Sequence, residues 1–428
     1  MKAIASCLAS IVSEENGVCL WESIEPSHQQ RIQQAIAPGN TPSCIVYPST
    51  PEQLAAVIAA AHHHNWRVLP CGNSSKINWG GVTIGAEVVV STERINRLIA
   101  HAVGDLTVTV EAGMKFSQLQ AILAEHRQFL ALDPAMPASA TIGGIVATGD
   151  TGSFRQRYGS VRDQLLGITF VRADGQIAKA GGRVVKNVAG YDLMKLFTGS
   201  HGTLGVISQV TFRVYPQQAT SGTVVLTGEA DAISQAAATL RNSALTPTQA
   251  DLLSTKLVST LELGKGLGLI TRFQNISESV KEQSNRLLQV GEKLGLNGAF
   301  YGDAEEANLW QRLPEQIHSA NTESVITCKI GILPTASVEL LQQVEIGLIH
   351  MSSGLGWLQF SHLDQALQVR SICEKSGGFL SILTAPIAVK QKIDIWGYPG
   401  NALQLMRDIK KQFDSNNIFS PGRFVGGI

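Results

Sequence analysis

From Pro48 onward, short apolar runs alternate with residues that are typical of turns. Thr50-Pro51-Glu52-Gln53 supplies a capping hydroxyl, a proline for the first helical position and a glutamine three residues after the cap, and an apolar run follows at residues 54–58. This arrangement predicts that a helix begins at Pro51. Residues 67–70 have the pattern of a short buried strand and lead directly into a glycine-rich loop, residues 71–76. Strands are also predicted at residues 86–91 and 107–111.

Elements of both kinds continue to about residue 217. Residues 116–127 predict a helix, because their apolar positions fall on one helical face. Asp174-Gly175 separates two strand-like runs and predicts a hairpin between residues 165–172 and 176–180. The remaining predictions are a helix start within residues 141–148, a short helix at 191–197 and a strand at 205–214. Since helices and hairpins are interleaved without a simple βαβ repeat, the predicted fold class is α+β.

The composition of the chain changes after Tyr215-Pro216. Longer stretches with less glycine follow, and residues 230–241 and 280–294 are helical by pattern. A domain boundary is therefore predicted near residue 217, and the turn-rich tail is expected to dock back onto the earlier part of the chain. The predicted organisation is an N-terminal helical segment at 1–39, a first domain at 40–217, a second domain at 218–398 and a C-terminal segment at 399–428.

Composition and charge narrow the function classes. The 428 residues include 34 Lys+Arg and 34 Asp+Glu, so the net charge of +0 argues against a dedicated nucleic-acid binder. With 44% hydrophobic and 16% charged residues, the chain has the material for a core, and general disorder is excluded. No apolar run approaches the roughly 18 residues of a membrane span, so we expect no transmembrane segment.

Cysteine and histidine spacing argues against a metal centre in this chain. The six cysteines are scattered without a C-x-x-C pair, which excludes an iron–sulfur cluster or zinc ribbon built from this chain alone. His318, His350 and His362 each lack a second histidine at ligand spacing. Residues 62–64 are consecutive histidines on a predicted helix, where neighbouring side chains point about 100° apart and cannot converge on one ion. We therefore predict no metal site.

Four clusters of small, hydroxyl-bearing or cationic residues carry candidate chemistry. Residues 72–75 can turn successive backbone N–H groups toward one point and bind a pyrophosphate, although an ordinary loop has the same composition. Residues 141–148 leave little side-chain volume along one surface, where a large planar group or a neighbouring sheet could lie. Residues 158–163 place a cation in a loop, where it would face an anion or form a surface salt bridge. Residues 199–207 permit a close approach of backbone to a neighbour before a strand.

In this order and at these separations, the four clusters resemble the FAD-binding domain of the vanillyl-alcohol-oxidase (PCMH-type) family. The resemblance spans about residues 40–217 and implies a two-subdomain FAD-binding domain, followed by a smaller α+β cap or substrate domain. It also implies that the loop after the first strand holds the pyrophosphate, the small-residue segment contacts the flavin and ribityl chain, and the strand entered at Gly202 lies by the adenine. The residues that the resemblance assigns to FAD binding are Pro70, Gly72, Asn73, Ser74, Ser75, Lys76, Pro137, Thr141, Gly143, Gly144, Ala147, Thr148, Tyr158, Gly159, Ser160, Arg162, Gly202, Gly205, Val206 and Ile207.

A narrower resemblance rests on two strings. Gly182-Arg-Val-Val-Lys186-Asn-Val-Ala-Gly-Tyr191-Asp-Leu-Met-Lys195 and Phe419-Ser-Pro-Gly-Arg423-Phe are similar to the FAD-binding E subunits of bacterial glycolate oxidases, which are glycolate dehydrogenases. This implies oxidation of glycolate, or of a related 2-hydroxy acid such as D-lactate, to the 2-oxo acid, as in photorespiratory glycolate metabolism. It implies two partners, a larger homologous flavoprotein subunit and an iron–sulfur subunit that receives the electrons. A cytoplasmic chain is expected, with peripheral membrane contact through its partners.

Two departures from the family pattern limit what the resemblance implies. Covalent members have a histidine in the pyrophosphate loop, whereas Asn73, Ser74 and Ser75 stand here, so FAD is expected to be non-covalent. The motif H-x-G-D-G-N-x-H, which relatives use for metal and substrate, is missing from the C-terminal half. The catalytic residues are therefore unknown, with Lys186, Tyr191 and Arg423 as candidates.

Two alternatives to a subunit of a glycolate dehydrogenase complex stay open. One is a free-standing FAD-dependent 2-hydroxy-acid dehydrogenase. The other is a non-catalytic structural subunit with a degenerate flavin site. Asp150, close to Thr148 in the sequence, favours the latter, because an anion near a flavin pyrophosphate is unfavourable.

Overall fold

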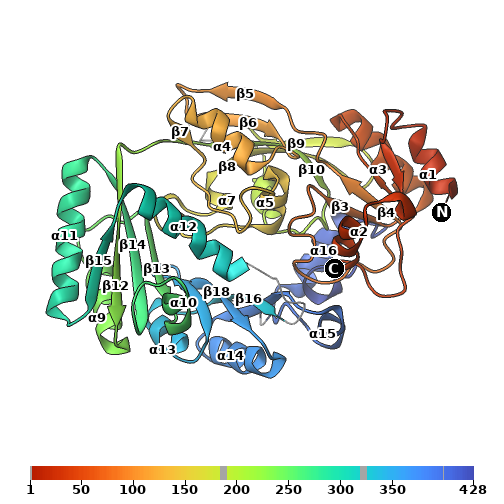
Figure 1. Ribbon diagram of the computed structural model, residues 1–428. Helices are drawn as coiled ribbons and strands as arrows, with labels where there is room; N and C mark the ends of the chain where they lie inside the picture. The colour runs from red at the N-terminus through yellow and green to blue at the C-terminus, as the bar shows by residue number, and fades with distance from the viewer. Residues whose placement is uncertain (1, 184–189, 319–324, 399) are drawn as a thin grey trace.

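The computed structural model describes residues 2–183, 190–318, 325–398 and 400–428. It is an α+β structure with three larger sheets and one two-stranded ribbon. In Figure 1 the two sheets of the first half of the chain lie at the top and right, and the large sheet of the second half lies below and to the left. The candidate site lies where these parts meet.

The N-terminal sheet has four strands in the order β1-β2-β4-β3. β2, β4 and β3 are parallel neighbours, and β1 pairs antiparallel with β2. Apolar residues from α1, α3 and this sheet form one core, and α2 contributes Ile32 to a second core around the buried Ile45 and Leu69. The bounds are α1 Lys2–Ala9, β1 Val18–Leu20, α2 Pro26–Gln33, β2 Cys44–Val46, α3 Pro51–His64, β3 Val68–Cys71 and β4 Val88–Ser91, with a 3₁₀ turn η1 at Trp21–Ser23.

The second sheet has five antiparallel strands in the order β5-β6-β10-β8-β9. Its core joins this sheet to α4, α5 and α8. The short strands β7 and β11 pair with each other beside it. The bounds are β5 Leu98–Ala102, β6 Thr107–Glu111, α4 Phe116–Ala124, β7 Gln128–Phe129, α5 Ile142–Thr148, α6 Arg155–Tyr158, α7 Val161–Gln164, β8 Leu165–Val171, β9 Ile177–Gly181, α8 Leu193–Phe197, β10 Val206–Arg213 and β11 Tyr215–Pro216.

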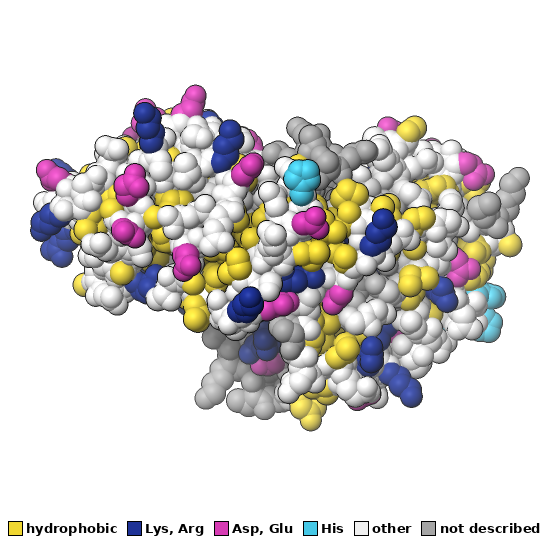
Figure 2. All heavy atoms as spheres, turned by 90° about the horizontal axis from the view of Figure 1, so that it is seen from below, with side chains coloured by type: hydrophobic (Ala, Val, Ile, Leu, Met, Phe, Trp, Pro, Cys, Tyr) yellow, Lys and Arg dark blue, Asp and Glu magenta, His cyan; other side chains and the backbone are white. Residues whose placement is uncertain are grey.

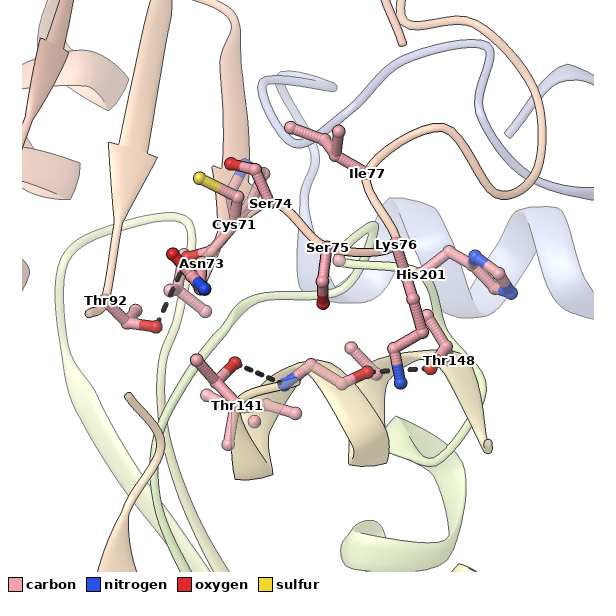
Figure 3. A pocket seen from close by; sticks show the side chains of 18 of the residues that line it. Cys71, Asn73, Ser74, Ser75, Lys76, Ile77, Thr92, Thr141, Thr148 and His201 are labelled. Carbon is pink, nitrogen blue, oxygen red and sulfur yellow. Dashed lines mark hydrogen bonds between the residues drawn. The ribbon is translucent and has the colours of Figure 1, made fainter. Parts of the chain in front are cut away.

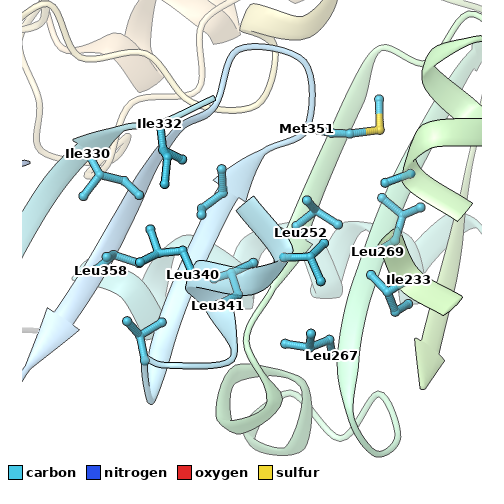
Figure 4. Close-up of a cluster of buried hydrophobic side chains, with 14 of the residues drawn as sticks. Ile233, Leu252, Leu267, Leu269, Ile330, Ile332, Leu340, Leu341, Met351 and Leu358 are labelled. Carbon is cyan, nitrogen blue, oxygen red and sulfur yellow. The ribbon is translucent and has the colours of Figure 1, made fainter. Parts of the chain in front are cut away.

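The third sheet has eight antiparallel strands in the order β15-β12-β14-β13-β17-β18-β16-β19. On one face it packs against α9, α11, α13 and α14, and Figure 4 shows part of this core, with Ile233, Leu252 and Leu341 among its side chains. The other face packs against α10, α12 and the first half of the chain through Trp79 and Ala135.

The bounds in this second half are β12 Thr220–Gly228, α9 Ala230–Arg241, β13 Gln249–Leu253, α10 Thr255–Thr260, β14 Leu267–Asn275, α11 Ser277–Lys293, β15 Asn297–Tyr301, α12 Asp303–His318, β16 Ile326–Gly331, η2 Pro334–Ala336, α13 Ser337–Leu341, β17 Ile346–His350, β18 Leu355–Phe360, α14 Leu363–Lys375, β19 Phe379–Thr384, α15 Ile387–Lys392, α16 Leu403–Phe413 and η3 Val425–Gly427.

After α16 the chain returns to its first half, where residues 418–420 run parallel to the start of β3. The backbone N–H of Val68 donates to the Ile418 carbonyl at 2.7 Å, and that of Ser420 donates to the Val68 carbonyl at 2.9 Å. The buried Lys410 ammonium donates to the carbonyls of Thr203 and Phe419. These bonds fix the C-terminal segment along the strand that leads into the glycine-rich loop.

Most of the element types predicted from the sequence are confirmed. The Thr50 hydroxyl accepts a hydrogen bond from the Gln53 N–H at the start of α3, and the predicted hairpin is the β8–β9 pair. One predicted boundary needs correction, and one strand was not predicted. The helix predicted for 116–127 ends at Ala124, because Arg127 takes a left-handed φ of 52°. β5 was not predicted, because its residues are exposed or half-exposed and do not alternate cleanly.

Figure 2 shows one face of the molecule, seen from below. Basic and acidic side chains are interspersed over it, with hydrophobic side chains between them. This mixture agrees with the balanced formal charge of the chain. Within the described residues, no helix is both long and apolar enough to cross a membrane.

Candidate functional site

A cleft forms where the glycine-rich loop after β3 passes over α5 (Figure 3). Thr141 caps this helix, because its Oγ1 accepts a hydrogen bond from the Gly144 N–H at 3.3 Å. A Cβ atom on Gly72 would lie 2.1 Å from the same Thr141 Oγ1. The loop can therefore approach the helix start only with glycine at this position.

The cleft collects most of the residues predicted to bind FAD. Its volume is about 90 Å³. The predicted residues that line it are Pro70, Gly72, Asn73, Ser74, Ser75, Lys76, Thr141, Gly143, Gly144, Ala147, Thr148, Gly202, Gly205, Val206 and Ile207. Segments separated by more than a hundred residues thus meet around one space, as the resemblance implied.

Other predicted residues lie elsewhere. Tyr158, Gly159, Ser160 and Arg162 are outside the lining of this cleft, and Pro137 lines a second cavity. Tyr158 belongs to an aromatic cluster with Phe129, Phe154 and Tyr215. The backbone N–H and the hydroxyl of Ser160 both donate to the Asp163 carboxylate at the start of α7, so local contacts account for both residues.

Of the three catalytic candidates, the structure brings one to the cleft. Arg423 lines it from the C-terminal segment. The Tyr191 residue is 87% exposed and lies away from the lining of both cavities, so the structure gives it no place in the site. Lys186 lies outside the described residues.

Arg423 presents a cationic nitrogen without a hydrogen-bond partner. Its Nη2 donates to the carbonyls of Ile77 and Trp79, which fixes the end of the glycine-rich loop. Its Nη1 is buried and has no partner within the described residues. Burial lowers the pKa of Arg423 to about 10, so the guanidinium is still charged at neutral pH. An unpaired buried cation of this kind fits an anionic ligand.

Asp150 is neutralised rather than free. Its Oδ2 lies 2.7 Å from the Nζ of Lys76, and both side chains are almost completely buried. Burial would raise the pKa of Asp150, but the charge of Lys76 and its hydrogen bond hold it below its usual value. The sequence-based argument that Asp150 opposes a bound pyrophosphate is therefore wrong, because the carboxylate is paired with a loop lysine.

Five residues that were not predicted also line the cleft, namely Cys71, Ile77, Thr92, Ser200 and His201. His201 was detectable, because it lies between two glycines in the fourth cluster. It takes a left-handed φ of 52°, and its ring packs against Trp396, with the centroids 4.9 Å apart. Desolvation and the nearby Arg423 hold the pKa of His201 well below its usual value, so the ring is neutral.

A second and larger cavity, about 720 Å³, lies between the first half of the chain and the eight-stranded sheet. It adjoins the cleft through two contacts. Asp150 lines the cavity and holds Lys76, which lines the cleft. Ser139 also lines the cavity, and its carbonyl accepts a hydrogen bond from Asn73 of the cleft at 3.2 Å.

Polar groups of both halves meet in this cavity. Asp251 of β13 accepts from the Ser153 hydroxyl and lies 2.7 Å from Nδ1 of His350. Arg272 pairs with Glu306 at 2.9 Å. Ser153, Arg272 and His350 line the cavity, whereas their partners Asp251 and Glu306 are not among its lining residues. The further polar or aromatic residues that line it include Asp133, Gln249, Trp310, His318 and Trp357. The part of the chain that the structure describes holds no group of three or more His, Cys, Asp or Glu side chains that could bind a metal ion.

Comparison with known proteins adds a family and several relatives. Residues 42–181 match the family described as FAD binding domain. The mitochondrial D-lactate dehydrogenase [cytochrome] of Arabidopsis thaliana is 28% identical over 282 residues, which are 64% of this chain and 49% of that protein. A D-lactate dehydrogenase of Archaeoglobus fulgidus is 27% identical over 411 residues, 89% of this chain and 91% of that protein.

A further relative is the glycolate oxidase subunit GlcD of Bacillus subtilis, which is 26% identical over 231 residues, 54% of this chain and 49% of that protein. The chain thus spans about half the length of the Arabidopsis and Bacillus relatives. Among solved structures, p-cresol methylhydroxylase superposes with a TM-score of 0.74 at 15% identity, covering 99% of this chain and 96% of that one. At this identity the superposition shows a shared fold alone.

Proposed function

Residues 42–181 of the chain belong to the FAD-binding domains of the PCMH type, and from this premise we propose that the chain is the FAD-binding subunit of a glycolate dehydrogenase complex. The proposal includes oxidation of glycolate, or of a related 2-hydroxy acid such as D-lactate, to the 2-oxo acid. The observation that carries it is the cleft, in which the glycine-rich loop, the small-residue helix and the unpaired Arg423 nitrogen face one space.

The residues present fit the cofactor. Gly72 allows the loop to approach Thr141 at the start of α5, and the backbone of this loop faces the cleft. A pyrophosphate in the cleft would accept hydrogen bonds from the N–H groups of the loop. Arg423 would supply a cation to an anionic part of the cofactor, and Lys76 is kept in place by Asp150. FAD, when bound, supplies the two-electron oxidation that a 2-hydroxy acid requires.

Non-covalent attachment is part of the proposal. Covalent members of the family use a histidine in the pyrophosphate loop, and Asn73, Ser74 and Ser75 stand there in this chain. His201 lines the cleft from another segment, and its ring packs against Trp396 and Phe424. This packing supports a structural role for the ring.

The substrate class and the partners are proposed from the relatives. Their names refer to D-lactate, D-2-hydroxyglutarate and glycolate, which are all 2-hydroxy acids. The six cysteines are free and scattered, so an iron–sulfur centre would have to lie in a partner. We place a larger homologous flavoprotein subunit and an iron–sulfur subunit beside this chain in the cytoplasm, with any membrane contact made through them.

A free-standing dehydrogenase is the second candidate. The observation that favours it is the cavity of about 720 Å³ next to the cleft, which has room for a substrate in this chain itself. The third alternative, a structural subunit with a degenerate flavin site, was favoured by an anionic Asp150 near the pyrophosphate. Because Asp150 is paired with Lys76, this residue no longer favours it.

The test is the visible absorption spectrum of the purified chain before and after acid precipitation, followed by anaerobic addition of glycolate and D-lactate. A flavin spectrum that moves into the acid supernatant supports non-covalent FAD. Bleaching by one acid without partners supports the free-standing enzyme, and bleaching only with the partner subunits supports the complex. A colourless chain that cannot be reconstituted with FAD would contradict the proposal.

A further inference from the structure

Residues 77–80, which follow the glycine-rich loop, are held by a buried lysine that the proposed cofactor site does not use. The Nζ of Lys390 in α15 donates to the carbonyls of Asn78 and Gly80, with 2.9 Å to the latter. It also donates to the carbonyl of Leu383 in β19 at 3.2 Å. An ammonium has three donors, and here each of them meets a backbone carbonyl. Within the described residues no carboxylate forms an ion pair with Lys390, so its charge is buried without a counter-charge.

Arg423 holds the same residues from the C-terminal segment. Its Nη2 donates to the carbonyls of Ile77 and Trp79, whereas Lys390 binds the carbonyl of the residue that follows each of them. The carbonyls of residues 77–80 thus alternate between two cations from the second half of the chain. Because residues 71–77 line the cleft, these two cations fix the point at which the lining loop ends.

The charged groups around Lys390 are mainly cations. Residues 77–80 and β19 contribute no titratable side chain, and Lys392 and Asp394 on its own segment are exposed. The ring of His201 lies beside Gly80, since its Nδ1 would be 3.5 Å from a Cβ atom there. This ring is kept neutral by desolvation and by a group of cations, namely Arg423, Lys329, Lys76 and Lys390, which lower its pKa. Asp150 is already bonded to Lys76 and leaves the other cations without an acid of their own.

These surroundings make the charge of Lys390 depend on the cleft. Burial, and after it the charge of Arg423, lower the pKa of Lys390 from 10.5 to about 7. An anion in the cleft, where the second nitrogen of Arg423 has no partner, opposes the charge that acts on Lys390 and so favours its protonated form. The neutral amine loses one donor and turns a lone pair toward a carbonyl, so only the protonated form satisfies all three carbonyls.

We propose that Lys390 takes up a proton when an anionic ligand, which is FAD in the proposed function, enters the cleft. The inference rests on the proposed function for the identity of this ligand. Lys390 does not line the cleft, so it is a positioning residue that acts through Arg423 and residues 77–80. Because the anion raises the pKa of Lys390, the affinity is highest below about pH 7 and falls as the pH rises through the raised pKa.

The test is calorimetric titration of the full chain with FAD at pH 7.5 in HEPES and in Tris, whose different heats of ionisation report the protons taken up. About one quarter of Lys390 is charged at this pH, so we expect an uptake of about one half to three quarters of a proton per FAD. The affinity for FAD should fall at least about tenfold from pH 6 to pH 9, since one pKa unit corresponds to tenfold. The pyrophosphate of FAD has no group that titrates in this range. Binding without proton uptake would overturn the inference.

Three variants assign the proton to Lys390. Lys390→Arg stays charged throughout this range, so its affinity for FAD should not depend on pH and no proton should be taken up. Lys390→Met has no donor and should bind FAD more weakly, again without proton uptake. Lys392→Met, at an exposed position of the same helix, is the matched control and should keep the uptake of the unchanged chain. Asp133 also titrates near pH 7, so an uptake that persists in Lys390→Arg would assign the proton to another group and overturn the inference.

The same titrations separate this inference from the proposed function. If FAD binds without proton uptake, the inference fails and the proposed function stands. If FAD does not bind at any pH, the proposed function fails, and titration with ADP-ribose, which carries the same pyrophosphate, decides the inference. Proton uptake with ADP-ribose that is lost in Lys390→Arg supports it, and no uptake or no binding overturns it. Circular dichroism melting curves show whether each variant folds, and Lys390→Arg and Lys390→Met provide two independent substitutions.

Discussion

The Nζ of Lys76 and the Oδ2 of Asp150 lie 2.7 Å apart in the wall between the cleft and the larger cavity. One partner follows β3 in the glycine-rich loop, and the other follows α5. Asp150 also accepts from the Ala135 N–H at 3.0 Å, which places its carboxylate under the loop that borders the cavity. The pair therefore joins the two segments that the cofactor and the substrate would share.

Removing one member of this pair is expected to destabilise the chain. Asp150→Asn leaves the Lys76 ammonium buried without a counter-charge, so the free energy of unfolding should fall by about 3–5 kcal/mol. Urea titration at pH 7 measures it. In the exposed pair Arg286–Glu282, Arg286→Ala should cost less than about 1 kcal/mol and serves as the control. A loss of similar size in both variants would contradict the buried-pair argument.

Gly72→Ala tests the close approach of the loop to α5. The added Cβ would lie 2.1 Å from the Thr141 Oγ1, which is itself held as the helix cap, so the loop has to move. We expect FAD affinity to fall at least about tenfold, since backbone donors misplaced by an ångström lose their hydrogen bonds. Fluorescence titration of the apoprotein with FAD measures this.

Gly104→Ala is the matched control for that variant, because nothing lies within 4 Å of its added Cβ and its φ is not in the left-handed region. The double variant Gly72→Ala, Thr141→Ala removes the clash and should recover part of the affinity. FAD binding by Gly72→Ala at the level of the unchanged chain would show that the loop does not contact the cofactor.

Arg423→Met tests whether the unpaired nitrogen faces an anion. FAD affinity should fall about 10- to 100-fold, because a charge-assisted bond is lost and the cleft keeps no guanidinium at this place. Arg423→Lys retains the charge but has a single nitrogen, which cannot both bond the loop carbonyls from the place of Nη2 and face the cofactor from the place of Nη1, so an intermediate affinity is expected. If both variants weaken FAD equally, the role of Arg423 is to hold the loop rather than to meet the anion.

Local signals in the sequence, together with the family resemblance, identified most of the residues that line the cleft. The Thr50 cap, the Asp174-Gly175 turn and the three clusters that reach the cleft, at residues 72–75, 141–148 and 199–207, depend on backbone conformations that only a few residue types permit. They could therefore be recognised without tertiary information. Arg423 was among the catalytic candidates because the segment that contains it, residues 419–424, resembles the E subunits of bacterial glycolate oxidases. Its contacts with Ile77 and Trp79 join residues more than 340 positions apart and could not be derived from spacing.

The larger cavity could not be predicted in the same way. Asp251 and His350 are 99 residues apart and meet through the pairing of β13 with β17, and Ser153 reaches them from the other half of the chain. The sequence showed His350 as an isolated histidine, because histidine partnerships across strands depend on register.

Asp133 should make the stability of the chain fall as the pH rises from about 4 to about 7. Burial raises its pKa from 3.8 to about 7, although its bonds from the Phe154 and Gly152 N–H groups and the nearby His350 oppose the shift, while Asp251 adds to it. Between these two pKa values the folded chain holds a proton that the unfolded chain has released. The stabilisation is therefore complete below about pH 4 and lost as the pH passes through 7, with an upper limit of about 4 kcal/mol.

Asp133→Asn cannot ionise, so urea denaturation from pH 4 to pH 8 should show a flatter dependence in this variant than in the unchanged chain. Its absolute stability is expected to be lower at acidic pH, because an amide nitrogen would face the Phe154 and Gln249 donors that the carboxyl oxygen now accepts. The difference in slope, not in absolute stability, is thus the diagnostic quantity. Asp105→Asn, at an exposed position, should leave the slope unchanged. Parallel curves for Asp133→Asn and the unchanged chain would show that Asp133 is ionised throughout this range.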